Sequence, residues 1–157
     1  MTDWAVVRPE PVSTPVNGIA WGAPNTLWLA RDSAYVSRST DGGLTWEDHA
    51  LPGTNAQVLD IHAFDSDHAI AGTRSGHIMQ TTDGGSTWTV LLTTVNSRFG
   101  NIHFHDSQTG IAVTGDPDRK SEALVYRTTD GGSSWVILAR VPSRFPVSYT
   151  HLRAHET

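Results

Sequence analysis

The stretch TTDGGSTW, residues 81–88, decides the fold of this chain because close copies of it occur twice more. STDGGLTW stands at residues 39–46 and TTDGGSSW at residues 128–135, so consecutive copies begin 42 and 47 residues apart. A repeat of this length, with short apolar runs and Gly-rich turns between the copies, is typical of a β-propeller with one blade per repeat. A motif that recurs in every blade is expected to be structural, since an enzyme needs its chemistry at one place.

The repeat extends beyond the motif. Residues 60–66 read DIHAFDS and align with residues 101–107, which read NIHFHDS. Each unit holds about four strand-length apolar runs bounded by Gly, Asp, Ser or Asn, and no window has a sustained helical period. In the second unit, the sequence predicts strands near 58–64, 69–74, 77–82 and 87–93. The predicted fold is therefore an all-β propeller with four-stranded antiparallel blades.

About three blades fit into the 157 residues. We expect a lead-in at 1–15 and a propeller region at 16–146, with blades at about 16–52, 57–94 and 98–141. A polar, Pro-containing stretch at 116–121 lengthens a loop of the third blade. Propellers usually close with four to eight blades, so the sequence predicts a fragment of a larger ring, with self-assembly of copies as the other possibility.

The last eleven residues, 147–157, follow no blade pattern. They resemble a translated sequencing adaptor, and we expect them not to belong to the native protein.

The chemistry of the motif explains its recurrence. A short carboxylate before Gly-Gly can accept hydrogen bonds from the N–H groups of a tight hairpin turn, and the glycines allow positive φ. The flanking hydroxyl residues can tie the turn to that carboxylate, and the closing Trp buries a large ring whose N–H needs a partner. The predicted structural residues are Ser39, Asp41, Gly43, Thr45, Trp46, Thr81, Asp83, Gly85, Thr87, Trp88, Thr128, Asp130, Gly132, Ser134 and Trp135.

All three copies resemble the Asp-box, also called the bacterial neuraminidase repeat. Propellers with this repeat include sialidases, other glycosidases, sortilin-like receptors and assembly factors, so the resemblance implies a fold more than an activity. The wider pattern over about residues 16–140 is most similar to the photosystem II stability/assembly factor-like group. That similarity implies a non-catalytic scaffold that binds a protein partner.

Two functions are alternatives to the protein-binding scaffold: a sialidase-like glycoside hydrolase and a carbohydrate-binding propeller. A retaining sialidase needs three Arg, a Tyr nucleophile supported by Glu, and an acid/base Asp. Tyr occurs only at 35, 126 and 149, and Glu only at 10, 47, 122 and 156, without a recognisable pairing of the two. The sequence therefore predicts no catalytic residue.

Composition and charge narrow the set of partners. The formal net charge is −5 and Cys is absent, so we expect no nucleic-acid partner, no disulfide and no thiolate metal site. His103, His105 and Asp106 could together hold a metal, but His62 takes the place of His103 in the preceding unit, which favours a packing role. We predict no metal and no cofactor.

Arg31 and Arg74 fall at equivalent ends of the second predicted strand in two units. Because Arg suits interfaces and bidentate contacts, the pair is a candidate basic rim patch for a protein partner. The N-terminus lacks the pattern of a signal peptide, and no apolar run reaches transmembrane length, so no membrane insertion is expected. The sequence leaves localisation open; it favours the cytoplasm by default, although many relatives are exported.

Overall fold

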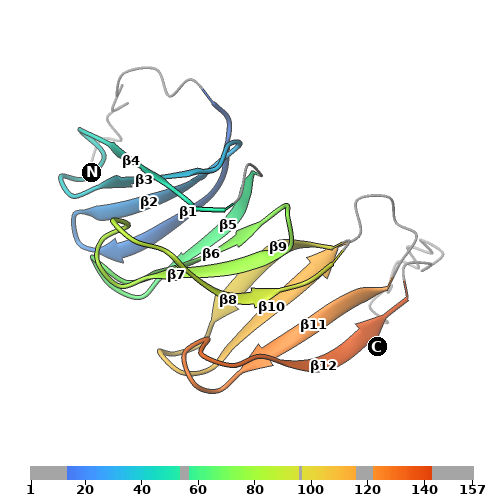
Figure 1. Cartoon of the computed structure of the whole chain (residues 1–157). Coiled ribbons are helices and arrows are strands. Elements are labelled where there is room, and N and C mark those ends of the chain that lie inside the picture. Colours follow the sequence, from blue (N-terminus) through green and yellow to red (C-terminus); the bar gives the residue numbers. More distant parts are fainter. Residues whose placement is uncertain (1–13, 54–56, 96, 116–121, 143–157) are drawn as a thin grey trace, which may run out of the picture.

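The computed structural model describes residues 14–53, 57–95, 97–115 and 122–142. They form three four-stranded antiparallel sheets, and the described residues contain no helix. The three sheets stand side by side along the chain (Figure 1). Their strands are β1 (Val16–Ala23), β2 (Thr26–Arg31), β3 (Tyr35–Ser39) and β4 (Glu47–Ala50); β5 (Val58–Ala63), β6 (Ala69–Thr73), β7 (His77–Thr81) and β8 (Thr89–Thr93); β9 (Arg98–Phe104), β10 (Gly110–Gly115), β11 (Ala123–Thr128) and β12 (Val136–Val141).

This architecture confirms the predicted all-β fold with four-stranded blades. In the second blade, the predicted strands match β5 to β8 with ends that differ by at most two residues. The polar loop at 116–121, residues 1–13 of the lead-in and the C-terminal segment at 147–157 lie outside the described residues.

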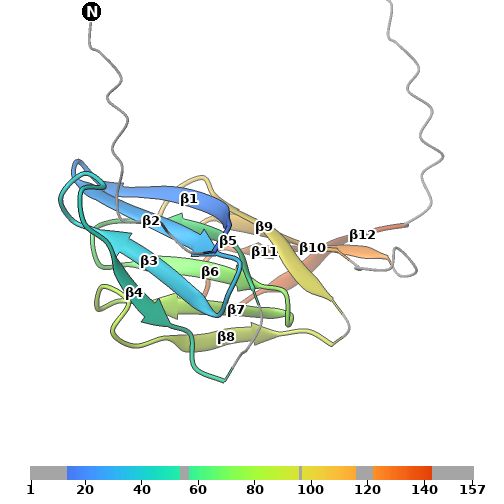
Figure 2. The same cartoon turned by 90° about the horizontal axis from the view of Figure 1, so that it is seen from above.

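Within each blade the strands pair in chain order. The first strands β1, β5 and β9 contact one another in succession, and the fourth strands β4, β8 and β12 form the exposed outer edge. Figure 2 shows the first two blades running in the same order, from β1 and β5 on one flank to β4 and β8 on the other. β2 and β6 are buried along their whole length, which explains why their sequences are almost continuously apolar.

The core consists of two apolar layers between blades. The layer between the first and second blades includes Trp28, and its ring meets that of Trp88 edge-on at a centroid distance of 6.5 Å. The layer between the second and third blades includes Ile70 and Phe104. The second blade therefore buries both of its faces, whereas each of the other two has one blade neighbour among the described residues.

Candidate functional site

The turn between β7 and β8 shows how the repeated motif works. Thr81 Oγ1 donates to Asp83 Oδ1 at 2.8 Å and accepts from the backbone N–H of Gly85 at 2.9 Å. Asp83 Oδ1 also accepts from Thr87 N at 2.8 Å, and its Oδ2 accepts from Thr87 Oγ1 at 2.6 Å. Gly84 and Gly85 have φ of +72° and +95°, a region that favours glycine. The carboxylate thus sits at the centre of the hairpin.

The same bonds recur in the other two turns. Asp41 accepts from Ser39 and Thr45, and Asp130 accepts from Thr128 and Ser134, at distances between 2.6 and 2.9 Å. Gly43 and Gly132 have φ of +91° and +93°, and each donates its N–H to the leading hydroxyl of its motif.

These bonds set the acidity of the three carboxyl groups. In each of Asp41, Asp83 and Asp130, the hydroxyl bond from the residue four positions later lowers the pKa most, and the backbone bond from that residue adds to it. The pKa falls from 3.8 to about 2 in all three. A carboxyl group with so low a pKa is ionised at neutral pH and is unsuited to act as a general acid.

Each motif turn is joined to the other turn at the same end of its blade. The first Gly of the motif donates its N–H to the carbonyl oxygen of a residue in the turn between the first two strands, at 2.9 Å in every blade. The pairs are Gly42 with Asn25, Gly84 with Asp67, and Gly131 with Gln108. The motif therefore stabilises one whole end of the blade, because it joins its own hairpin turn to the turn between the first two strands.

The sequence analysis expects a hydrogen-bond partner for the indole N–H of each closing tryptophan, and one of the three has such a partner. The Trp46 indole N–H donates to Gly43 O at 3.1 Å. Trp88 and Trp135 bury their Nε1 atoms without a hydrogen-bond partner in the described residues. Their rings instead pack edge-on against Trp28 and Phe104, so apolar contact positions them.

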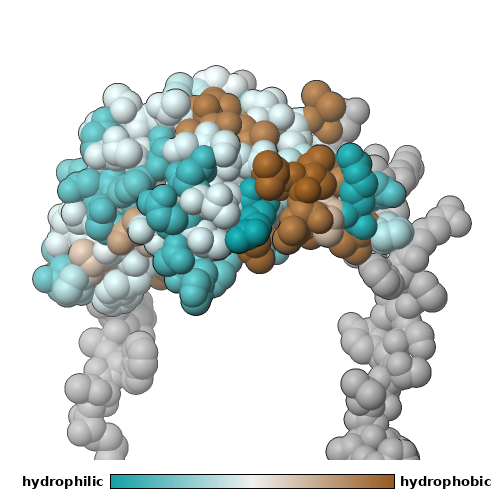
Figure 3. All heavy atoms as spheres, turned by 90° about the horizontal axis from the view of Figure 1, so that it is seen from below, coloured by the Kyte–Doolittle hydropathy of each residue, from teal (hydrophilic) through white to brown (hydrophobic). Residues whose placement is uncertain are grey.

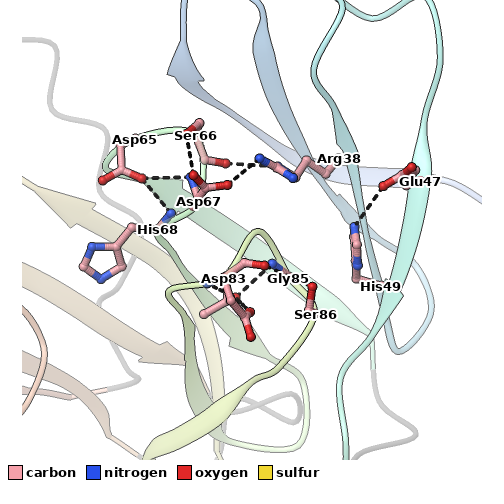
Figure 4. Close-up of polar contacts among 11 residues, drawn as sticks. Arg38, Glu47, His49, Asp65, Ser66, Asp67, His68, Asp83, Gly85 and Ser86 are labelled. Carbon is pink, nitrogen blue, oxygen red and sulfur yellow. Dashed lines mark hydrogen bonds and ion pairs between the residues drawn. The ribbon is translucent and has the colours of Figure 1, made fainter.

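The junction between the first two blades contains polar contacts that the sequence analysis missed. Arg38 on β3 donates through Nε to Ser66 O at 3.0 Å and through Nη2 to Asp67 Oδ1 at 2.7 Å (Figure 4). Its guanidinium also lies 5.3 Å from the centroid of the Trp28 ring. Arg127 occupies the same position in the third blade. This recurrence of Arg is the feature of the sequence that could have predicted a contact here.

Close packing of a motif turn against the preceding blade recurs at both junctions. A Cβ built on Gly85 would stand 2.9 Å from the His49 ring, and one built on Gly132 would stand 2.8 Å from Ile70 Cδ1. The second Gly of the motif thus serves two purposes, positive φ and close approach of the neighbouring blade.

The two arginines proposed as a rim patch differ in their surroundings. Arg31 is only 5% exposed and donates to Thr14 Oγ1 and Ser37 Oγ, with Asp48 Oδ1 at 3.4 Å. The rim-patch prediction is wrong for Arg31, because these neighbours enclose its guanidinium and accept hydrogen bonds from all three of its nitrogens. Arg74 is exposed and donates to Gln57 Oε1 at 2.9 Å.

His62 on β5 and His103 on β9 stand at equivalent positions of the second and third blades. His62 packs against Phe64, Phe104 and His103, with its ring centroid 6.2 Å from that of His103. Burial lowers the pKa of His62, and the nearby His103 lowers it further. In the part of the chain that the structure describes, no group of three or more His, Asp or Glu side chains is placed to hold a metal ion. That part also contains no helix suited to span a membrane.

Comparison with known protein families gives a match over most of the chain. A family model described as Sortilin-Vps10 (sortilin, neurotensin receptor 3) matches residues 34–156. The chain belongs to the Sortilin-Vps10 family. A curated relative, vacuolar protein sorting/targeting protein 10 of Colletotrichum graminicola, is 33% identical over 87 residues, which is 52% of this chain. The chain spans only 5% of that relative's length.

Solved structures with the same fold include proteins of different functions. YCF48 from Cyanidioschyzon merolae matches 83% of this chain and 39% of its own chain, with a TM-score of 0.65 and 23% identity. YCF48 bound to a D1 peptide gives a TM-score of 0.56 at 15% identity, over 86% of this chain and 71% of that one. An ancestral GH74 enzyme gives 0.68 at 21% identity, over 91% of this chain and 20% of the enzyme. At these identities the likeness shows a shared β-propeller fold.

Proposed function

We propose that this family member is a non-catalytic propeller segment that binds a protein partner, in the manner of the assembly-factor-like group. The observation that carries the proposal is the hydrogen bonding and the low pKa of the three repeated carboxylates. Asp41, Asp83 and Asp130 use both oxygens within their own turns and have a pKa of about 2. The most conspicuous acidic residues of the chain therefore hold the scaffold together.

The comparisons support a peptide or protein as the ligand. One YCF48 structure holds a D1 peptide, and the curated relative is named for protein sorting and targeting. These propellers share an all-β framework with this chain, and exposed turns at the ends of rigid blades are suited to present binding groups. We propose an extended peptide segment of a partner protein as the ligand class.

Arg74 is the candidate contact that remains from the predicted patch. It follows β6, at the end of the second blade opposite the motif turn, and Gln57 holds its exposed guanidinium in place. A guanidinium that is already oriented can bind a carboxylate in a bidentate manner with little further loss of side-chain freedom. We propose that Arg74 binds an acidic side chain or a terminal carboxylate of the partner.

A selection of displayed random peptides against the immobilised chain tests the proposal. Peptides that bind in solution by fluorescence anisotropy, with micromolar affinity, are the expected result. Arg74→Ala should weaken the binding of acidic peptides about tenfold, the cost of a charge-assisted bond. Arg140→Ala is the matched control, since Arg140 is exposed and pairs with Glu122 on the third blade. Failure to select any binding peptide would contradict the scaffold proposal.

A glycoside hydrolase is the second candidate, because GH74 enzymes are among the similar folds and one of them is a xyloglucanase from Xanthomonas campestris. Sialidase-like hydrolysis and carbohydrate binding belong to the same alternative. Incubation with xyloglucan and with a sialyl-lactose substrate, followed by measurement of released sugar, separates the hydrolase from the scaffold, and binding of the same sugars without release would indicate the carbohydrate-binding propeller. The scaffold proposal predicts no release above a boiled-protein control, and turnover would overturn it.

A further inference from the structure

Each motif turn contains an Asp–Gly dipeptide, at residues 41–42, 83–84 and 130–131. Such a dipeptide isomerises readily, because glycine has no side chain to keep its backbone nitrogen away from the preceding carboxyl carbon. The nitrogen attacks Cγ of the aspartate and water leaves, which gives a cyclic succinimide. Water then opens the ring at one of its two carbonyls and returns either aspartate or isoaspartate, so the overall reaction neither adds nor removes atoms.

The attacking nitrogen is already engaged in the structure. Gly84 donates its N–H to Asp67 O in the neighbouring turn at 2.9 Å, and the equivalent bonds of Gly42 and Gly131 have the same length. The nitrogen must leave this bond before it can attack the carboxyl carbon. Gly84 is also buried, and a Cβ built on it would stand 2.6 Å from Arg38 Nη1 of the preceding blade.

The carboxyl group is held in place as well. Asp83 Oδ1 accepts hydrogen bonds from Thr81 Oγ1 and Thr87 N, and Oδ2 accepts one from Thr87 Oγ1 at 2.6 Å. These bonds must break before the group can turn toward the nitrogen of Gly84. The reaction also favours a protonated carboxyl group, since its oxygen leaves as water, and the bonds lower the pKa of Asp83 to about 2.

We propose that each motif turn is a latent site of isoaspartate formation, in which the Asp–Gly pair is inert while the turn is closed and isomerises once the turn opens. Isoaspartate carries one methylene group in the main chain that aspartate carries in the side chain. The shortened carboxylate can no longer reach the donors four positions later, so the opened hairpin cannot close again. This inference is independent of the proposed function.

The turn at Asp83 is the best place to test the proposal. The second blade packs against a blade on each face, so all the contacts of this turn lie within the described residues. In the folded chain, isomerisation should follow the fraction of time for which the turn is locally open. A change that loosens only this turn should therefore increase isomerisation at this site alone.

Peptide mapping of the folded and the unfolded chain is the first test. Trypsin places the three motifs in separate peptides, residues 39–74, 75–98 and 128–140. In guanidinium chloride at about pH 5, electron-transfer mass spectrometry should detect isoaspartate accumulating in all three. The folded chain should react more than about tenfold more slowly, since a pKa of about 2 in place of 3.8 alone lowers the protonated fraction roughly sixtyfold. A smaller ratio would overturn the proposal.

Variants of Thr87 make the test specific to one turn of the folded chain. Thr87→Ala removes the hydroxyl bond to Asp83 and should raise isoaspartate formation in peptide 75–98 about tenfold, the effect of one bond to a charged group. Thr87→Ser should keep the parent rate, because Ser134 makes the same bond to Asp130. Thr89→Ala, at an exposed position on β8, is the matched control. A rate for Thr87→Ala no higher than for Thr89→Ala would contradict the proposal.

Aggregation is a separate cause of irreversible unfolding. Apolar side chains gather over the third blade when the molecule is viewed from below (Figure 3), and the exposed side chains of β12 include Val136 and Leu138. The chain incubated in denaturant is therefore refolded below about 1 µM, where aggregation is slow. Isoaspartate should be confined to the molecules that do not regain the circular dichroism of the parent chain. Fully refolded molecules with isoaspartate in all three turns would contradict the proposal.

Discussion

The first and second blades carry the same pattern of residues but differ in how that pattern is covered. Ile61 on β5 is 4% exposed and Ile19, its equivalent on β1, is 65% exposed. The second motif turn is packed under His49, whereas the first has no such neighbour among the described residues. The difference shows that the repeat encodes faces suited to burial, while the adjoining blade decides whether burial occurs.

Truncation of these two isoleucines should give the largest contrast. Ile61→Ala is expected to cost about 2–5 kcal/mol of unfolding free energy, because it leaves a cavity between two blades. Ile19→Ala should change it by less than about 0.5 kcal/mol, since that side chain is mostly solvated. Urea unfolding at a protein concentration that keeps the chain monomeric measures both. Equal losses at the two positions would show that Ile19 is buried in solution.

Substitution of the second glycine in two motif turns should give the next largest effect. Gly43→Ala and Gly85→Ala both place a Cβ at positive φ, which costs roughly 1–2 kcal/mol. Gly85→Ala also drives a methyl group into the His49 ring and should cost about 1–3 kcal/mol more.

His49→Ala in the Gly85→Ala background is the control for this second comparison. Removal of the ring should recover most of the extra loss, which a double-mutant cycle of unfolding free energies would show. If the two losses simply add, the contact between the blades is not the cause.

Substitution of the equivalent arginines Arg38 and Arg127 should give the smallest effect on stability. Arg38→Ala removes two hydrogen bonds across a junction and a contact with the Trp28 ring, and we expect a loss of about 1 kcal/mol. Arg127→Ala, at the equivalent exposed position, should leave the unfolding free energy of the monomer almost unchanged. Thermal unfolding of the two variants at matched concentration measures the difference, and a loss for Arg127→Ala as large as that for Arg38→Ala would contradict this explanation.

The sequence predicted the framework well because the relevant interactions are local. Strands β5 to β8 follow from apolar runs bounded by turn residues, and the turn at Asp83 follows from the spacing of its own donors and acceptors. The burial of Arg31 could not be predicted from such local interactions. Its burial depends on Ser37 and Asp48, which approach it only when the sheet forms.

Contacts between blades were also beyond the sequence analysis. Arg38 and Asp67 are 29 positions apart, and no local pattern pairs them. The difference between Ile19 and Ile61 is likewise invisible in the residues themselves, because both stand in equivalent apolar strands. Alignment of the repeats shows which positions are equivalent, and only the arrangement of the blades shows which of them are covered.

The repeated carboxylates are structural and remain ionised at neutral pH. The most direct measurement is the pH titration of the side-chain carboxyl ¹³C shifts of Asp41, Asp83 and Asp130 by NMR. We predict a pKa of about 2 for all three, with the stability that the ionised groups provide present above pH 3.8 and lost as the pH falls through 2. A pKa above 3.8 for any of them would contradict the structural role and indicate a carboxyl group suited to proton transfer.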